Sequence, residues 1–167
     1  MNITQILSDE HQVILGVITK ALVECDAIET GKAVDVAFFT KTIDFIINYA
    51  DKFHHAKEED VLFKAMVDNS SRLHCNPIPV MLHEHDQGRH FVEGMAKALA
   101  AHNTGDLIAN TRGYCFLLQH HIFKEDNVLY PMAEEALNDG QKEMVLLNYL
   151  EVEKKLKSEF DVERFLF

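Results

Sequence analysis

The chain has 167 residues, of which 47% are hydrophobic and 26% are charged, and its net charge is −11 with neutral histidines. This length and composition are typical of one globular domain and exclude a disordered chain. The negative charge argues against nucleic acid and anionic membranes as partners, because both bind basic surfaces. Only seven glycines and three prolines are present, and this scarcity of helix breakers favours long helices.

The cysteines and the N-terminal residues indicate the compartment. Cys25, Cys75 and Cys115 are scattered and form no Cys-x-x-Cys pair, so neither a disulfide framework nor a thiolate zinc site is expected. Residues 1–11, MNITQILSDEH, become polar too early for a signal peptide, and no apolar run is long enough to span a bilayer. We expect a cytoplasmic protein.

Two helices are predicted in the first half of the chain. Apolar side chains recur at helical spacing over residues 3–29, and Gly31 marks the end of this first helix. A second helix is predicted over residues 34–69. The mixed turn residues of 69–77 then predict a loop.

The second half repeats this organisation. A third helix is expected to begin at Pro77 or Pro79, because proline fits the first helical turn, and to end near Ala101. After a turn at 102–106, a fourth helix is predicted over residues 106–137. Pro131 lies within it and should kink the helix or mark a local break.

The predicted fold is all-α. It consists of one domain, residues 1–167, with an up-down-up-down four-helix bundle over about 3–137 and a C-terminal helical extension over 141–167. The extension ends in the apolar residues Phe165, Leu166 and Phe167. It is expected either to cover the bundle or to form a homodimer interface.

A repeated motif points to the functional site. HHAKEEDVLF, residues 54–63, recurs as HIFKEDNVLY, residues 121–130, so that two copies of His-x-x-x-Glu lie 67 residues apart. The identical pairs are His54 and His121, Lys57 and Lys124, Glu58 and Glu125, Val61 and Val128, and Leu62 and Leu129. A coincidence of this length is improbable, so the two segments are expected to share a role.

Helical geometry selects one His/Glu pair from each copy. Each residue of an α-helix advances by about 100°, so Glu58 lies within about 40° of His54. The apolar residues on the same face are Ile43, Ile47, Ala50, Val61 and Ala65. By contrast, His55 and Glu59 lie about 100° and 140° from His54, toward the polar side. The predicted pair is therefore His54/Glu58.

The fourth helix gives the equivalent pair, His121/Glu125. The side chains predicted within about 40° of His121 are Tyr114, Leu117, Glu125, Val128 and Met132. His120 and Asp126 fall outside this face.

Two further histidines complete the pattern, and each follows a glutamate in the sequence. His11 lies on the apolar face with Leu7, Leu15, Ile18 and Leu22. His85 lies on the face with Ile78, Met81, Val92, Ala96 and Leu99. Helices one and two thus resemble helices three and four, and a bundle built from them would bring four histidines and two glutamates together near a pseudo-twofold axis.

These six side chains predict a metal site. Two buried carboxylates without partners would cost several kcal/mol, and no Lys or Arg is evident on the two faces. The expected ligands are His11, His54, Glu58, His85, His121 and Glu125. Imidazole and carboxylate without thiolate suit Fe, Mn, Zn or Co. Two six-coordinate ions with bridging glutamates and an oxo or hydroxo bridge use the whole set, whereas one zinc ion would use four of the six.

The remaining polar candidates are given other roles. The histidines expected in solvent are His74, His83, His90 and His102. His55 and His120 flank the ligand faces and are expected to support ligands or lie at the surface. Arg89 follows His85 by one turn and is expected to pair with an acid. Tyr114 is either a core aromatic or a redox and hydrogen-bonding residue near the site.

The motifs resemble the hemerythrin-like proteins, in particular the bacterial and archaeal HHE cation-binding group. The resemblance rests on the Glu-His of the first helix, HHAKEEDVLF, EHDQGR and HIFKEDNVLYPMAEE, which together span residues 9–135. It implies a four-helix bundle with a non-haem diiron centre, and by position it implies the same six ligands. Oxygen carriers of this family have a fifth histidine one turn before the third-helix ligand, where this chain has Met81.

Three functions are compatible with this pattern. The first is a binding or sensing protein for O2 or a related small oxidant. The second is an enzyme acting on peroxide or nitric oxide, or an iron donor in iron–sulfur cluster repair, since the resemblance extends to the ligand set of the family's repair branch. The third is a metal-free helical scaffold, which the cost of gathering six polar groups in one core disfavours.

Overall fold

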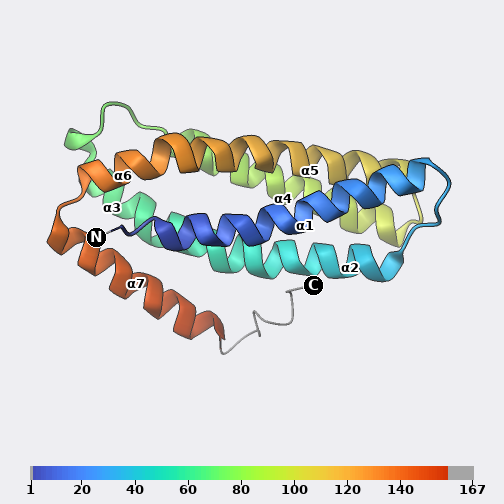
Figure 1. Ribbon diagram of the computed structural model, residues 1–167, viewed down its shortest axis with the longest axis horizontal. Helices are drawn as coiled ribbons and strands as arrows, with labels where there is room; N and C mark the ends of the chain where they lie inside the picture. Colours follow the sequence, from blue (N-terminus) through green and yellow to red (C-terminus); the bar gives the residue numbers. More distant parts are fainter. Residues whose placement is uncertain (1, 158–167) are drawn as a thin grey trace.

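A computed structural model describes residues 2–157 of the chain. Within this range the chain is helical and contains no strand. The elements are α1 (Gln5–Glu29), α2 (Val36–Phe45), η1 (Ile46–His55), η2 (Glu58–Leu62), α3 (Phe63–Asp68), η3 (Ser70–Arg72), α4 (Ile78–Ala100), α5 (Thr104–Lys124), η4 (Glu125–Leu129), α6 (Tyr130–Ala136) and α7 (Asp139–Lys157). Figure 1 shows the long helices side by side along the long axis, with α7 lying obliquely across them near one end. The prediction of an all-helical bundle is confirmed.

The helices begin and end where local chemistry favours it. The Asp35 carboxylate accepts a hydrogen bond from the Phe38 backbone N–H at 2.9 Å, and Asn103 does the same for Asp106 at 3.1 Å. Both are side-chain caps that satisfy a free N–H group of the first turn. The cap at Asn103 places the start of α5 at Thr104, two residues before the predicted start.

The N-terminus of α1 is capped from a distant part of the chain. Glu134 of α6 accepts backbone hydrogen bonds from Ile3 at 2.6 Å and Thr4 at 3.0 Å. The same carboxylate forms an ion pair with Lys142 of α7 at 2.9 Å. One side chain therefore ties together α1, α6 and α7.

Two equivalent helix ends use the left-handed backbone conformation. Gly31 follows α1 with φ of 106°, and His102 follows α4 with φ of 53°. In each case the next residue closes a hydrogen bond across the end: Lys32 N–H to Ala27 O at 3.0 Å, and Asn103 N–H to Ala98 O at 2.9 Å. This is the usual way to satisfy free carbonyls at a helix C-terminus, and glycine adopts it without steric cost.

The second and fourth helices each contain π-helical turns. η1 and η2 lie in the second helix, and η4 lies in the fourth. A π turn closes its backbone hydrogen bond from residue i to i+5 and holds one more residue than an α turn. The bond from Phe63 N–H to Glu58 O closes η2, and the bond from Tyr130 N–H to Glu125 O closes η4. Both turns begin at a glutamate of the repeated motif.

The π turns change which residues face the core. Ile47 and Val128 were predicted on the buried faces, but they are 38% and 47% exposed. The prediction was wrong there because it assumed about 100° per residue, and each of these residues is separated from its histidine by a π-helical segment. At Pro131 the predicted local break corresponds to η4, which ends just before Tyr130.

The core has two apolar clusters along the bundle. One includes Ile18, Phe45, Met95 and Tyr114 among others, and the second includes Leu7, Leu62, Met81, Leu129 and Tyr149 among others. In the second and fourth helices, the His and Glu residues of the motif lie between residues of the two clusters. The polar centre is therefore enclosed by apolar packing at both ends.

The described part of the C-terminal extension is α7. Asn138 and Gln141 cap its start reciprocally, with each side chain accepting a hydrogen bond from the other residue's backbone N–H at 3.0 and 2.9 Å. Val145 and Tyr149 are buried in the second core cluster. Phe165, Leu166 and Phe167, predicted to form a cover or a dimer interface, lie outside the described residues.

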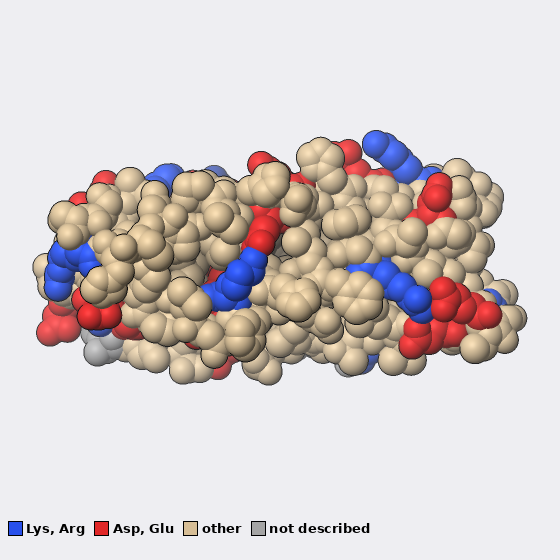
Figure 2. Space-filling view, turned by 90° about the horizontal axis from the view of Figure 1, so that it is seen from above, with Lys and Arg blue, Asp and Glu red and all other residues tan. Residues whose placement is uncertain are grey.

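The surface carries both charged and uncharged side chains. Figure 2 shows a face with large areas of uncharged side chains and with acidic and basic side chains in mutual contact. None of the helices within residues 2–157 could span a bilayer.

Candidate metal centre

The six side chains predicted as metal ligands meet in the middle of the bundle. They come from α1, η1, η2, α4, α5 and η4, and each is at most 2% exposed. They are His11, His54, Glu58, His85, His121 and Glu125. The structure thus brings together side chains that are up to 114 residues apart in the sequence.

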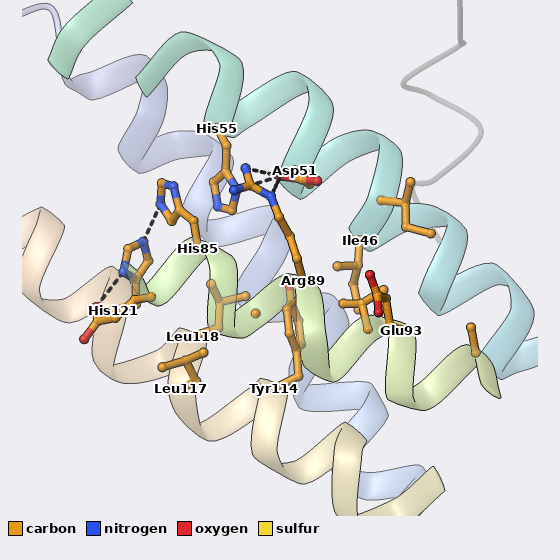
Figure 3. Close-up of a pocket in the computed structure, with 15 residues that line it drawn as sticks. Ile46, Asp51, His55, His85, Arg89, Glu93, Tyr114, Leu117, Leu118 and His121 are labelled. Carbon is orange, nitrogen blue, oxygen red and sulfur yellow. Dashed lines mark hydrogen bonds and ion pairs between the residues drawn. The ribbon is translucent and has the colours of Figure 1, made fainter. Parts of the chain in front are cut away.

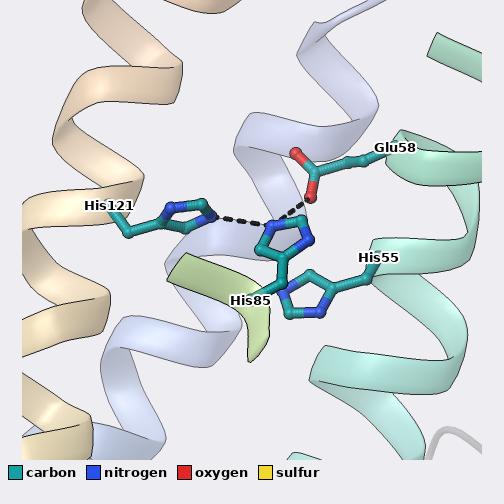
Figure 4. Close-up of side chains that lie close together, drawn as sticks. All are labelled: His55, Glu58, His85 and His121. Atoms are coloured by element: carbon teal, nitrogen blue, oxygen red, sulfur yellow. Dashed lines mark hydrogen bonds and ion pairs between the residues drawn. The ribbon is translucent and has the colours of Figure 1, made fainter. Parts of the chain in front are cut away.

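The histidines meet in two pairs. The Nε2 atoms of His11 and His54 are 3.0 Å apart, and those of His85 and His121 are 2.9 Å apart. Figure 4 shows the second pair with Glu58 directed toward it. Each pair forms one end of the centre.

The two carboxylates connect the pairs. Glu125 places one oxygen 3.3 Å from His11 Nε2 and the other 3.0 Å from His121 Nε2. Glu58 Oε2 lies 3.6 Å from Nε2 of both His54 and His85. Each glutamate therefore reaches both ends of the centre.

A further carboxylate contacts the other ring nitrogen, Nδ1, of each of the four histidines. The Nδ1 atoms of His11, His54, His85 and His121 lie 3.0, 2.9, 2.7 and 2.9 Å from oxygens of Asp126, Glu10, Glu59 and Glu84 respectively. A carboxylate accepts hydrogen bonds, so Nδ1 carries the proton and Nε2 presents its lone pair to the centre. This carboxylate–histidine arrangement is typical of metal-binding histidines.

The four carboxylates at the Nδ1 atoms, called the outer carboxylates below, repeat with the same symmetry as the predicted ligands. Glu10 and Glu84 each precede a ligand histidine, and each bonds to the histidine of the following helical segment. Each also forms an ion pair with a lysine of the repeated motif, Glu10 with Lys57 and Glu84 with Lys124. The pseudo-twofold relation predicted for the ligands extends to the groups around them.

Lys57 departs from the sequence-based expectation that these faces carry no Lys or Arg. Its side chain is fully buried, lies 3.9 Å from the centre of the Phe53 ring and contacts the carboxylates of Glu10 and Glu153. Its charge is thus directed to the outer carboxylates, and no ion pair joins it to Glu58 or Glu125 within the described residues. The two central glutamates still need a cation.

Buried carboxylate oxygens that lack a hydrogen bond also indicate that the centre suits cations. Within the described residues, Glu58 Oε2 and both oxygens of Glu125 are buried without a hydrogen bond, which native proteins seldom tolerate. The facing Nε2 lone pairs, about 3 Å apart, repel unless a proton or a cation lies between them. Imidazole and carboxylate donors fit iron, manganese or zinc.

The protonation of the centre leads to the same conclusion. Burial raises the pKa of Glu58 well above its ordinary value, and the nearby charge of Glu125 raises it further. Burial acts the same way on Glu125, but His121 and His11 outweigh it and hold its pKa well below the ordinary value. For His11, burial opposes the charged form, yet Asp126 and Glu125 raise its pKa to about 10. Protons therefore stand where cations would bind, and metal binding releases them.

Three other residues near the centre differ from the sequence-based expectation. His55 is buried at 8% exposure and belongs to one of the two ligand groups, with Glu58, His85 and His121. Tyr130 donates a hydrogen bond to Glu58 Oε1 at 2.6 Å, a contact that the sequence analysis did not identify. Tyr114, the tyrosine singled out from the sequence, lines a neighbouring cavity instead.

Arg89 forms ion pairs, as predicted, and does so close to the centre. It contacts Asp51 at 2.8 Å, Glu59 at 2.8 Å and Asp86 at 2.9 Å. Because Asp51 bonds to His55 and Glu59 bonds to His85, the guanidinium fixes two carboxylates that hold histidines.

A cavity of about 370 Å³ reaches one end of the centre. Its wall includes His55, His85 and His121 but none of His11, His54, Glu58 and Glu125. Figure 3 shows these imidazoles at one side of the cavity, with Tyr114 and aliphatic side chains further along it. The cavity therefore borders the His85/His121 end of the centre.

Four imidazoles and two carboxylates buried between the helices of a bundle define a metal-binding helical protein. The family model described as Hemerythrin HHE cation binding domain matches residues 2–133. The chain belongs to this family, and as a hemerythrin-like domain it binds metal ions, iron in the typical case. No curated protein and no solved structure gave a match.

Proposed function

We propose that the protein holds two non-haem iron ions and binds or senses O2 or a related small oxidant. The observation that carries this proposal is the pair of ligand groups that share Glu58, one with His11, His54 and Glu125, the other with His85, His121 and His55. One ion held by a single group of four would leave three of these seven side chains unused. Two ions use both groups.

The ligand roles follow from the contacts. His11 and His54 would hold one ion, His85 and His121 would hold the other, and Glu58 and Glu125 would bridge them. Two iron ions held by these residues would supply electron exchange with a small oxidant. The chain itself fixes the imidazoles through the outer carboxylates and keeps the centre dry through the two apolar clusters.

The cavity supports a small apolar ligand. Ile46, Val92, Leu117 and Leu118 are among the residues that line it, and its volume is suited to a diatomic molecule with room for movement. An uncharged oxidant such as O2 partitions readily into such a space.

Metal content is the first test of this proposal. Protein prepared with iron should contain about two ions per chain and show the absorption of an oxo-bridged ferric pair. Glu58→Ala should lose at least half of the metal, because both ligand groups contain Glu58. Unchanged iron content in this variant would contradict the ligand assignment, and a preference for manganese or zinc would contradict the choice of metal.

A second candidate function is an enzyme acting on peroxide or nitric oxide, and Tyr130 favours it. Its hydroxyl lies 2.6 Å from Glu58 and 3.2 Å from His11 Nε2, where it holds a proton beside two of the proposed ligands. Rapid mixing of the reduced, iron-loaded protein separates the two functions. Release of intact O2 on degassing identifies a binding or sensing protein, whereas repeated consumption of peroxide or nitric oxide identifies an enzyme.

A further inference from the structure

We infer that His55 is a fifth imidazole ligand and binds the ion held by His85 and His121. This inference rests on the two-ion centre proposed above. It makes the two ends of the centre chemically different, with three imidazoles at one end and two at the other.

The position of His55 is the first argument. Its ligand nitrogen and the ligand atoms of Glu58, His85 and His121 all lie within 4.8 Å of one another. Its ring stacks on that of His85, with centroids 3.7 Å apart and planes 10° from parallel. Figure 4 shows both rings beside Glu58 and His121.

The contact between the His55 Nδ1 atom and a carboxylate is the second argument. Its Nδ1 atom lies 3.1 Å from an oxygen of Asp51, and Arg89 holds that carboxylate with bonds of 3.0 and 2.8 Å. The four predicted histidine ligands each have a carboxylate of their own at Nδ1. His55 therefore shares the tautomer that leaves the Nε2 lone pair available to a metal ion.

The broken symmetry is the third argument. In the repeat, His55 corresponds to Ile122, so the other half of the bundle has no equivalent imidazole. On α4, the residue one turn before His85 is Met81, which is buried in the second core cluster. His55 is thus the available source of a third imidazole at the His85/His121 end.

Ion binding requires one local movement. Two parallel rings do not aim at a common point, so the His55 ring must tilt away from His85 toward Glu58. His55 also forms part of the cavity wall, so as a ligand it stands between the cavity and the ion.

The test is a crystal structure of the iron-loaded protein with metal-release measurements on two variants. We expect His55 Nε2 at about 2.1 Å from one ion, the usual metal–imidazole distance. His55→Gln should release iron to a chelator at least about 10-fold faster than the unmodified protein. The matched control is His120→Gln, which alters an exposed histidine next to His121 and should leave the release rate unchanged.

The outcomes separate this inference from the proposed function. Two ions with His55 Nε2 more than about 3 Å from both would overturn the inference and leave the two-ion centre intact. Equal release rates for His55→Gln and His120→Gln would also overturn it. Absence of two bound ions in the unmodified protein would overturn both.

Discussion

The Tyr130 hydroxyl donates a hydrogen bond to Glu58 Oε1 at 2.6 Å, although the two residues are 72 positions apart. Tyr130 is the last residue of the second repeated motif, and the first motif has Phe63 in its place. Burial and the charge of Glu58 raise the pKa of Tyr130 well above its ordinary value, so the hydroxyl keeps its proton. The hydroxyl group that Tyr130 has and Phe63 lacks thus forms a hydrogen bond with a predicted ligand of the centre.

Replacing Tyr130 by Phe should destabilise the metal-free protein. Glu58 Oε1 would lose its donor in a fully buried site, and such losses cost about 1–3 kcal/mol. Urea unfolding of the metal-free protein measures the effect. Tyr114→Phe is the matched control, since Tyr114 is buried in the same bundle but lines the cavity. Equal losses in the two variants would argue against a specific role for the Tyr130 hydrogen bond.

Removing Glu84 should weaken metal binding without removing a ligand. Its carboxylate bonds to His121 Nδ1 at 2.9 Å and pairs with Lys124, so Glu84→Ala frees the imidazole to rotate. Loss of such a group typically reduces metal affinity about 10–100-fold. Competition with a chelator measures this. Glu93→Ala on the same helix, where the glutamate pairs with an exposed lysine, should retain full affinity.

Glu134 should make stability depend on pH. Burial opposes its charged form, but Lys142 and the backbone N–H groups of Thr4 and Ile3 outweigh this and lower its pKa. Its contribution is therefore complete above the unfolded-state pKa of about 4.3 and is lost as pH falls through the lower folded value. Glu134→Gln should cost about 1 kcal/mol at pH 7, since the carboxylate is partly exposed.

The pH dependence is checked by urea unfolding between pH 7 and pH 3. The difference between the unmodified protein and Glu134→Gln should shrink as the pH falls. Glu135→Gln alters an exposed neighbour and should have little effect at any pH. A difference that stays constant down to pH 3 would show that the charge of Glu134 is not the cause.

Substitutions at the two residues with left-handed backbone conformation, Gly31 and His102, should have opposite effects on stability. Gly31→Ala should lower the free energy of unfolding by about 1 kcal/mol, because no atom lies within 4 Å of an added Cβ and only the backbone conformation resists it. His102→Gly should raise it by about 0.5–1 kcal/mol, because glycine relieves the same strain. Thermal unfolding of both variants measures the two changes, and the same sign in both would contradict the explanation.

The sequence predicted the helices and the meeting of the six side chains because both depend on periodicity. His11 and His85 lie in uninterrupted α-helices, where about 100° per residue holds. The pairs His54/Glu58 and His121/Glu125 are each four residues apart, so errors of helical phase remained small. The up-down-up-down order of the helices and the domain boundaries stay predictions.

The placement of His55 could not be predicted in the same way. It ends η1, a segment of ten π-helical residues, and nothing in the motif reveals a π turn. The outer carboxylates were equally hidden. Glu10 and Glu84 precede ligand histidines and were noted only as neighbours in the sequence, because their partners lie on other helices.

The π turns that begin at Glu58 and Glu125 have a further consequence. Each one holds a residue that an ordinary turn would not need. Deleting the exposed residue Asp60 or Asn127 would let a regular turn close and would keep Glu59 and Asp126, which hold His85 and His11. We expect such a deletion to shorten the chain beside Glu58 or Glu125 and to alter the reach of that carboxylate.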